Sequence, residues 1–434
     1  MAIYFGTDGI RGVANVQITP DLATRCGNAL AQMGAKKVLI GRDTRRSGDM
    51  IVCGLGAGLT SGGCDVVDVG ILPTPAVAYL TKKYECDFGI VVSASHNPPE
   101  YNGIKIFSSQ GTKLCDQKEQ LVEELMATSR FVQSDKVGRY IHFDGMADYC
   151  SFLCDCANAS FRGLKVALDC SNGATFKSAK QVFEKLGAKT FVFFSNSEGS
   201  DINCGCGSTN PQTLAQKVVK LGCNVGFCFD GDGDRVVAVD EKGIVVDGDK
   251  ILYILAKEMH ANGKLAKNGV VGTFHTNVGI ENQLAKLGIT LFRSDVGDKY
   301  VSNLMKTKGL CLGGEQSGHI VVSQFLGTGD GTLVALLVCK LIQKTPLSKL
   351  AQTKLFKQVN VDVVVKDKMH VINNDSLWQE IKKQTQGFDG RVMVRASGTE
   401  PKIRVLAESK NEGLSTQVAQ NIAQVIRGID ECVE

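Results

Sequence analysis

The chain lacks an apolar run long enough to cross a membrane, and it lacks a recognisable export signal. Its most apolar stretch, residues 332–342, is interrupted by Lys340 and is shorter than the roughly 20 residues that a membrane-spanning helix needs. The N-terminal sequence Met-Ala-Ile-Tyr-Phe-Gly-Thr-Asp has no charged segment leading into an apolar core, so no signal peptide is expected. We therefore expect a cytoplasmic protein with no membrane partner.

Long blocks of basic residues are also absent. The 49 basic and 45 acidic residues are spread along the chain and give a net charge of +4. This distribution gives no support for nucleic-acid binding, whereas it suits a modest attraction for small phosphorylated molecules. With 434 residues, of which 43% are hydrophobic and 22% charged, the chain is expected to form several globular domains.

The sixteen cysteines lack the paired C-x-x-C spacing of common zinc sites. They cluster only at 150–156 and at 204–206. In a long chain without an export signal, most are expected to stay reduced, many of them as small core residues.

Three glycines at 54, 56 and 58 resemble a dinucleotide-binding fingerprint. That motif needs its glycines in the turn directly after a strand, whereas these fall inside a helical stretch. We expect them to allow close packing of a helix on the sheet, and no nicotinamide cofactor is indicated.

Three stretches of the chain repeat short β-branched strands that alternate with helical periodicity. Strands are expected at 37–40, 65–69, 164–168, 190–194, 223–229, 269–272 and 290–293, and helices near 175–187 and 279–287. Such alternation indicates mixed, mostly parallel sheets covered by helices on both faces. The tail instead has expected strands at 359–365, 391–395 and 403–408 and a closing helix at 411–428, which predicts a smaller α+β domain.

The fold class that we expect is therefore α/β, with a C-terminal α+β domain. We place the domains at residues 1–150, 151–248, 249–357 and 358–434.

The run Gly-Ile-Val-Val-Ser-Ala-Ser-His-Asn-Pro-Pro at 89–99 ends an apolar strand abruptly. Proline cannot continue a strand ladder and restricts the residue before it, so the chain must leave the sheet near Ser95. A hydroxyl at the carboxyl end of a strand lies where open α/β sheets bind their ligands, which makes Ser95 a candidate catalytic residue. The alternative is an Asn-Pro turn in which Ser95 and Asn97 bond only to local backbone.

Asp230, Asp232 and Asp234 alternate with glycines and precede Arg235. A tight loop can turn all three carboxylates toward one hard cation, whereas three like charges without a metal would repel one another. A calcium-binding EF-hand loop is excluded, because its sixth position requires glycine and strands flank this motif where helices should. The small number of ligands favours Mg²⁺.

Two further loops contain candidate binding residues. A Ser-Gly-Thr tip near the C-terminus, flanked by arginines, favours a phosphate site over a plain hairpin loop. A glycine-rich loop at 313–319 offers groups that could reach sugar hydroxyls, and its histidine is an acid–base candidate or a structural residue. The residues are Arg395, Ser397, Gly398, Thr399 and Arg404 in the first loop, and Glu315, Ser317 and His319 in the second.

At this point the sequence resembles the α-D-phosphohexomutases over nearly its whole length. The matching motifs are GTDGIRG at 6–12, SASHNP at 93–98, NGIKIF at 102–107, DGDGDR at 230–235, GGEQSGHI at 313–320 and RASGTEPKIRV at 395–405. The resemblance implies three related α/β domains and a C-terminal α+β domain around a central cleft. It also implies that Ser95 carries a phosphoryl group and binds one Mg²⁺ together with Asp230, Asp232 and Asp234.

The resemblance assigns the other loops to the sugar phosphate. Glu315 and Ser317 would contact sugar hydroxyls, and the loop at 395–399 would bind the phosphate that does not react. Arg11, Lys105 and Arg235 correspond to basic residues around the phosphoserine.

In the implied reaction, phospho-Ser95 phosphorylates a hexose 6-phosphate and then takes the other phosphate back from the 1,6-bisphosphate, which also serves as activator. A base must assist Ser95, and Lys105 and His96 are both candidates. The sequence of the 313–319 loop resembles that of family members that act on glucosamine phosphates and supply UDP-N-acetylglucosamine synthesis. The alternatives are mannose or glucose phosphates with the same mechanism, or a non-catalytic sugar-phosphate-binding protein.

Three places depart from the family pattern. Asn210 stands in Ser-Thr-Asn-Pro where histidine is expected. Lys299 stands in Gly-Asp-Lys-Tyr where arginine is expected, which keeps the charge but loses the bidentate fork. His275 stands in Phe-His-Thr-Asn where Met-Ser-Asn is expected, and we favour a hydrogen-bonded loop histidine there. A serine hydrolase is disfavoured because no G-x-S-x-G elbow surrounds Ser95. A homodimer is compatible with the sequence.

Overall fold

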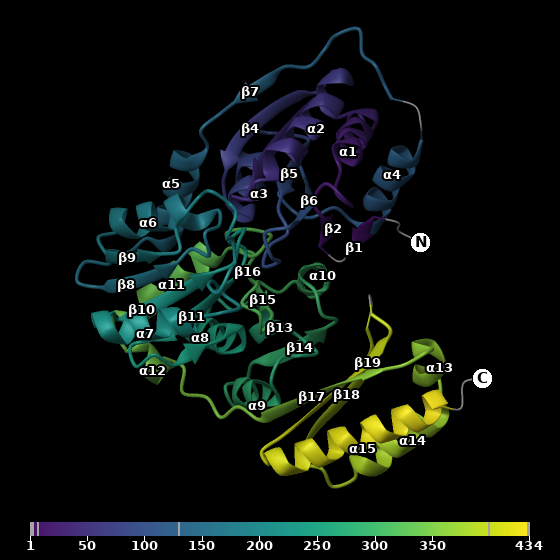
Figure 1. Cartoon of the computed structure of the whole chain (residues 1–434). Helices are drawn as coiled ribbons and strands as arrows, with labels where there is room; N and C mark the ends of the chain where they lie inside the picture. Colours follow the sequence, from purple (N-terminus) through teal and green to yellow (C-terminus); the bar gives the residue numbers. More distant parts are fainter. Residues whose placement is uncertain (1–3, 7, 129–130, 398–399, 432–434) are drawn as a thin grey trace. The chain divides into compact units, whose positions relative to one another are not determined.

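The computed structural model describes residues 4–6, 8–128, 131–397 and 400–431 (Figure 1). Its packing divides the chain into two units, one of Met1–Thr273 with Ser294–Gln352 and one of Phe274–Arg293 with Thr353–Glu434. The first unit contains Ser95 and the Asp230–Asp234 loop, and the second contains the expected phosphate loop.

The first sheet of the first unit has the strand order β1-β2-β6-β5-β3-β4-β7. The strands are β1 (Phe5–Gly6), β2 (Gly9–Val13), β3 (Lys37–Arg42), β4 (Asp65–Ile71), β5 (Phe88–Val92), β6 (Tyr101–Ser108) and β7 (Tyr140–His142). The helices are α1 (Pro20–Gln32), α2 (Gly48–Ser61), α3 (Thr74–Lys83) and α4 (Asp116–Ala127). β3 pairs in parallel with β4 and β5, whereas β5, β6, β2 and β1 pair antiparallel in succession.

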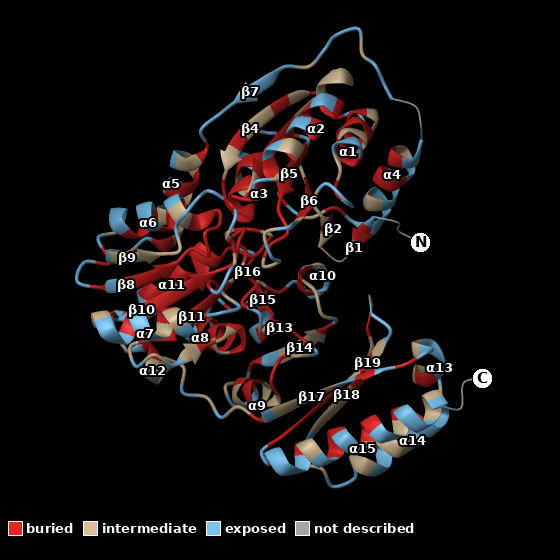
Figure 2. Ribbon diagram, in the orientation of Figure 1, coloured by how far each residue is buried: buried red, intermediate tan, exposed pale blue. Residues whose placement is uncertain are grey.

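Helices cover both faces of this sheet because its central strands are apolar on both sides. Val38 and Ile40 belong to one buried core with residues of α1 and α2, while Leu39, on the opposite face, is equally buried. All five residues of β5 are buried, as the red colouring of the central strands shows (Figure 2). The strand that leads to Ser95 is therefore fixed by packing on both sides.

The glycines at 54–58 lie in α2, in agreement with the expected helix, but their packing partner differs. A Cβ on Gly58 would lie 2.0 Å from a backbone oxygen of α1, and a Cβ on Gly54 would lie 2.9 Å from Ala23. Gly56 faces Tyr140 of β7. The prediction of helix-on-sheet packing is therefore wrong for Gly54 and Gly58, which allow α2 to approach α1 closely.

The second sheet has the order β12-β11-β10-β8-β9. Its strands are β8 (Lys165–Asp169), β9 (Lys189–Phe193), β10 (Val225–Phe229), β11 (Val236–Asp240) and β12 (Val245–Val246), and the neighbouring helices are α5 (Met146–Ala157), α6 (Thr175–Lys185) and α7 (Gln212–Leu221). β8 pairs in parallel with β9 and β10, whereas β10, β11 and β12 pair antiparallel.

The sheets are mixed, as expected, but the first two are not mostly parallel. Parallel and antiparallel pairings are equally frequent in each of them. The difference arises because hairpins add antiparallel strands at one edge of the parallel strands in each sheet. The alternation of strands and helices in the sequence predicts only the parallel strands.

The third group of elements contains a smaller sheet in which β15 pairs in parallel with β13 and antiparallel with β16. The elements are α8 (Gly248–Ala261), β13 (Gly269–Thr273), α10 (Asp298–Lys308), β15 (Leu312–Gly314), β16 (Ile320–Val322), α11 (Gly331–Ile342) and α12 (Leu347–Leu350). α11 is the most apolar stretch of the sequence, and its N-terminus is capped by Asp330, which accepts from Leu333 N at 2.9 Å. None of the described helices has both the length and the apolar character needed to span a membrane.

The second unit is built on an antiparallel sheet of order β17-β19-β18. Its elements are α9 (Val278–Lys286), β14 (Thr290–Ser294, of which Ser294 falls in the first unit), β17 (Lys357–Val364), α13 (Lys368–Ile372), α14 (Asp375–Gln384), β18 (Gly390–Ala396), β19 (Lys402–Ser409) and α15 (Glu412–Glu431). Val405 and Ile403 of β19 share a buried core with Ile422 of α15. This is the α+β domain that the sequence predicts.

The described cysteines are free thiols, and most of them are buried. Burial raises the pKa of several, for example that of Cys26 to about 12. They therefore serve mainly as small core residues, as the sequence suggests.

Candidate active site

Ser95 lies on the loop that follows β5, and the residue itself is completely buried. Its backbone has φ +52°, a left-handed conformation that non-glycine residues rarely adopt. Its N–H donates to Ser93 Oγ at 2.9 Å, and its hydroxyl donates to Asp230 Oδ2 at 2.6 Å. The structure therefore joins the first two candidate motifs, which lie 135 residues apart in sequence.

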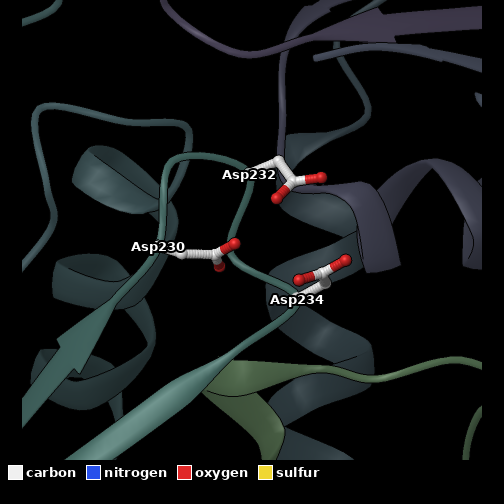
Figure 3. A group of neighbouring side chains, drawn as sticks. All are labelled: Asp230, Asp232 and Asp234. Carbon is white, nitrogen blue, oxygen red and sulfur yellow. The ribbon is translucent and has the colours of Figure 1, made fainter. Parts of the chain in front are cut away.

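Asp230, Asp232 and Asp234 lie on the tight loop between β10 and β11 (Figure 3). All three are buried, and each contributes a carboxylate oxygen within 4.8 Å of the other two. Asp232 Oδ1 and Asp234 Oδ1 accept no hydrogen bond from any described residue. Buried carboxylate oxygens without partners are costly, and a hard divalent cation would satisfy them, so the residues present fit a metal site.

Lys105, on β6, is the main countercharge of this cluster. Its Nζ lies 2.8 Å from Asp232 Oδ2 and 3.4 Å from Asp234 Oδ2. Burial favours the neutral amine, but Asp232, Asp8 and Asp234 hold the pKa of Lys105 well above its ordinary value. In this arrangement Lys105 is therefore an ammonium group that donates hydrogen bonds to the carboxylates.

The pKa values of Asp230 and Asp234 shift in opposite directions. Burial and the neighbouring Asp234 and Asp232 raise the pKa of Asp230 well above its ordinary value. Burial opposes ionisation of Asp234 as well, but Lys105 and His319 keep its pKa well below the ordinary value. Strongly shifted pKa values of neighbouring groups cluster at functional sites, where burial and charge partners are arranged to produce them.

His96 lies beside the Ser95 hydroxyl, with Nδ1 3.4 Å from Ser95 Oγ. Burial, reinforced by Arg235 and Arg11, lowers the pKa of His96 to about 4. Its imidazole is therefore neutral near pH 7.

Arg11 is held on the Ser95 loop by its neighbours. Its Nη1 donates to Asn97 Oδ1 at 3.1 Å, and its Nη2 pairs with Asp8. Asp8 also accepts from Lys105 Nζ at 3.0 Å and pairs with Lys113, so it ties three cations to this side of the site.

The loop at 313–319 joins the same cluster through backbone contacts. Val236 N donates to Gly318 O at 3.1 Å, and Arg235 forms an isolated antiparallel bridge with His319. His319 is buried with Nδ1 3.6 Å from Asp234 Oδ1. Burial lowers its pKa, but Asp234, Asp298 and Glu315 outweigh that effect and raise it to about 8.

The two expected sugar-binding residues differ in exposure. Glu315 is buried, and its Oε1 accepts from Gly297 N at 3.0 Å, whereas Ser317 is exposed. Glu315 therefore supports the turn before α10, and Ser317 is the more accessible hydroxyl.

The expected phosphate loop lies in the second unit. Arg395 and Arg404 are directly opposite each other on β18 and β19. Arg404 also forms an ion pair with Glu400, whose Oε2 accepts from Arg404 Nη2 at 2.8 Å. Arg395 Nη2 lies 3.3 Å from His275 Nε2, and Ser397 N donates to Lys402 O at 2.8 Å. Gly398 and Thr399 lie outside the described residues.

Sequence reasoning missed three residues that hold this site. Asp8 belongs to the Gly-Thr-Asp-Gly motif, which could have drawn attention to it. Arg45 follows β3, the parallel neighbour of β5, and a polar residue just after such a strand could have been recognised as a candidate site residue. Asn203 lies in an irregular loop and gives no comparable signal. Arg45 Nη2 and Asn203 Nδ2 both donate to Ser95 O, at 3.0 and 2.9 Å.

Comparison with known protein families covers most of the chain. Residues 2–133, 142–243 and 247–357 match the phosphoglucomutase/phosphomannomutase alpha/beta/alpha domains I, II and III, and residues 359–425 match the C-terminal domain of the same family.

Individual relatives show the same likeness. The phosphoglucosamine mutase of Desulforudis audaxviator is 44% identical, and the alignment covers 99% of this chain and 99% of that protein. A phosphoglucomutase/phosphomannomutase family protein from Burkholderia thailandensis has the same fold, with a TM-score of 0.84 at 22% identity over 99% of this chain and 98% of that one. The N-acetylphosphoglucosamine mutase of Aspergillus fumigatus, solved with GlcNAc-6P and magnesium, has a TM-score of 0.71 at 16% identity over 99% and 96%.

The four matched domains and the full-length identity agree with the buried serine, acidic loop and arginine pair described above. The chain is a phosphomutase-type isomerase that belongs to the phosphoglucomutase/phosphomannomutase family, within the α-D-phosphohexomutases.

Proposed function

We propose that the protein is a phosphoglucosamine mutase that interconverts glucosamine 6-phosphate and glucosamine 1-phosphate. One observation carries the chemistry: the buried Ser95 hydroxyl lies 2.6 Å from Asp230 Oδ2, within a cluster of carboxylates and cations. A hydroxyl in such a place suits a phosphoryl carrier, because phosphoryl transfer needs positioning and charge neutralisation above all. The sugar is proposed from the 44% identical relative named for it.

Asp230, Asp232 and Asp234 would bind one Mg²⁺, which would neutralise oxygens of the phosphoryl group on Ser95. The fit rests on the two carboxylate oxygens that no described residue satisfies. Lys105 and Arg11 would add positive charge to the site. Lys105 is held there by its hydrogen bond to Asp232, and Arg11 by its hydrogen bond to Asn97.

In the first half of the reaction, the sugar hydroxyl oxygen bonds to the phosphorus of phospho-Ser95 while the bond from phosphorus to Ser95 Oγ breaks. The sugar hydroxyl loses its proton and Ser95 Oγ gains one as it leaves, so Ser95 ends as a free hydroxyl. The product is the 1,6-bisphosphate, which also acts as activator. In the second half, Ser95 Oγ loses its proton and bonds to the phosphorus of the other phosphate, while the bond from that phosphorus to the sugar oxygen breaks. The freed sugar oxygen takes up a proton, and Ser95 regains its phosphoryl group. His96 Nδ1 and Asp230 Oδ2 are the described acceptors nearest the Ser95 hydroxyl proton, at 3.4 and 2.6 Å.

Substrate binding is proposed for the remaining loops. Arg395, Ser397, Gly398, Thr399 and Arg404 would bind the phosphate that is not reacting, since Arg395 and Arg404 lie directly opposite each other and a guanidinium can bind phosphate through two hydrogen bonds. Ser317, Glu315 and His319 would contact the sugar, with Arg235 close to the phosphoserine.

The test combines intact-mass analysis with a substrate panel. Wild-type protein incubated with glucosamine 1,6-bisphosphate and Mg²⁺ should gain one phosphoryl group, and Ser95→Ala should gain none. Turnover should be fastest with glucosamine 6-phosphate. Faster turnover of mannose or glucose phosphates would show that glucosamine is not the preferred sugar. If the wild type gained no phosphoryl group, Ser95 would not be the phosphoryl carrier.

A further inference from the structure

The loop that carries Ser95 is held by two side chains from different parts of the first unit. Arg45 lies just after β3, and Asn203 lies in the loop after β9. Both donate to the same two carbonyl oxygens, those of Ser95 and Asn97.

Arg45 is buried, and its guanidinium spans the whole turn. Nη2 donates to Ser95 O at 3.0 Å and to Asn97 O at 2.7 Å, while Nη1 donates to Tyr101 O at 2.9 Å and contacts Pro98 O. The planar fork of arginine can serve several carbonyls in fixed directions, which a lysine ammonium on a flexible stem cannot do.

Asp43 links this guanidinium to the N–H side of Ser95. Its Oδ2 accepts from Arg45 Nε at 2.9 Å and from Ser93 Oγ at 2.5 Å. Ser93 Oγ in turn accepts from Ser95 N at 2.9 Å. Both polar backbone groups of Ser95 are therefore held, which fixes the left-handed conformation at this residue.

Asn203 completes the arrangement from the opposite side. Its Nδ2 lies 2.9 Å from Ser95 O and 3.0 Å from Asn97 O. Asn203 itself has φ +61°, a conformation that asparagine tolerates better than most residues. Gly231 packs directly against this contact, because a Cβ there would lie 2.6 Å from Ser95 O and 2.9 Å from Asn203 Nδ2.

We propose that Arg45 and Asn203 are positioning residues that hold Ser95 in its left-handed conformation, so that its hydroxyl stays aligned with Asp230 in both half-reactions. A left-handed conformation is strained for a non-glycine residue and persists only where the surrounding structure holds it. Without the two donors, Ser95 relaxes toward commoner conformations and its hydroxyl leaves Asp230. This inference rests on the proposed function, because it concerns the phosphoryl carrier.

The position of Asn203 allows a clean test. Asn203→Gly removes the amide and keeps the left-handed backbone without strain. Asn203→Asp keeps the size of the side chain and tolerates the same backbone conformation. It replaces the donating amide with a carboxylate oxygen, which repels the carbonyl oxygens of Ser95 and Asn97. The matched control is Asn158→Gly, which makes the same change at an exposed left-handed residue that ends α5. Arg45→Lys is the second variant.

The measurements are kcat, KM for glucosamine 6-phosphate and the rate at which Ser95 gains a phosphoryl group from the 1,6-bisphosphate, by intact mass. We expect Asn203→Gly to lower kcat and the phosphorylation rate about 10-fold and Asn203→Asp about 100-fold, since misplacement of a reacting atom by an ångström has effects of that size. KM should stay within about twofold in both, because the substrate is bound elsewhere. Arg45→Lys should behave like Asn203→Asp where it folds, and Asn158→Gly like the wild type.

Asn203 variants with wild-type kcat and phosphorylation rate, or with a raised KM and unchanged kcat, would overturn the inference. They would leave the proposed function intact, provided that the wild type gains its phosphoryl group. A wild type that gains none would refute the proposed function and this inference together.

Discussion

Lys105 Nζ lies 2.8 Å from Asp232 Oδ2, and both side chains are buried. The pair connects β6 of the first sheet to the loop between β10 and β11 of the second. Lys105 is thus the cation that allows a cluster of carboxylates to exist inside the fold before any metal binds.

Lys105→Met is expected to destabilise the metal-free protein by about 3 kcal/mol, because removing one partner leaves buried negative charge without compensation. Mg²⁺ should restore part of this loss, and its stabilising effect should be larger in the variant than in the wild type. Urea unfolding in EDTA and in Mg²⁺ measures both quantities. Lys118→Met, at an exposed position of α4, is the control, and equal Mg²⁺ effects in Lys105→Met and wild type would contradict the proposed metal site.

Gly231→Ala is expected to disturb the site through steric contact alone. Gly231 does not have a positive φ, so alanine is acceptable to the backbone, but its Cβ would lie 2.6 Å from Ser95 O. Overpacking of this kind costs about 1–3 kcal/mol and should displace the Ser95 loop from the acidic loop. Activity should fall more than stability suggests, whereas Gly428→Ala, with open space around it in α15, should be neutral or stabilising. Wild-type kcat in Gly231→Ala would contradict the close packing.

Asp330 should make stability depend on pH. Burial is the main cause that raises the pKa of Asp330 to about 7, although Leu333 N and Tyr149 donate to it. Because the folded protein holds this proton more tightly than the unfolded chain, the contribution of Asp330 is fully present below pH 3.8 and is lost as pH rises through about 7.

Asp330→Asn keeps an N-cap residue but has no carboxyl to ionise. As pH rises from 3.8 to about 7, the free energy of unfolding of the variant should therefore increase relative to that of the wild type by up to about 4 kcal/mol. Urea unfolding between pH 4 and 8 gives the difference. The control is Asp367→Asn at the exposed N-cap of α13, where hydrogen bonds from His370 and Met369 lower the pKa of the carboxyl, so its effect has the opposite sign. A constant difference between Asp330→Asn and wild type would contradict the prediction.

His275 should report on the arginines of the second unit. Burial first, and then Arg395, Arg391 and Arg404, lower the pKa of His275 to about 4. Arg404→Gln should therefore raise it toward 6.5, and a bound phosphate should do the same. An NMR titration, assigned with His275→Asn, measures the shift. Arg427→Gln, on the exposed side of α15, should leave it unchanged, and equal values in all forms would show that the arginines do not act on His275.

The sequence predicted those parts of the site that interrupt a strand with polar residues. Ser95 and Asp230 each follow an apolar strand, so their loops could be recognised from the sequence. Their joint site was expected from the family resemblance. The partner of the glycines in α2 could not be inferred, since local sequence shows that a helix surface is smooth but not what lies against it. Asn203 gave no signal because its role depends on a loop conformation that only the tertiary structure fixes.

Val91 and Lys105 are opposite each other on β5 and β6, so the proposed phosphoryl carrier and its principal cation belong to one hairpin. Successive side chains of a strand alternate between the two faces of a sheet. An insertion or deletion of one residue that shifted β6 against β5 would turn Lys105 to the wrong face without changing any residue of the motifs. The length of the turn between these strands is therefore as strict a requirement for this enzyme as the identity of the serine itself.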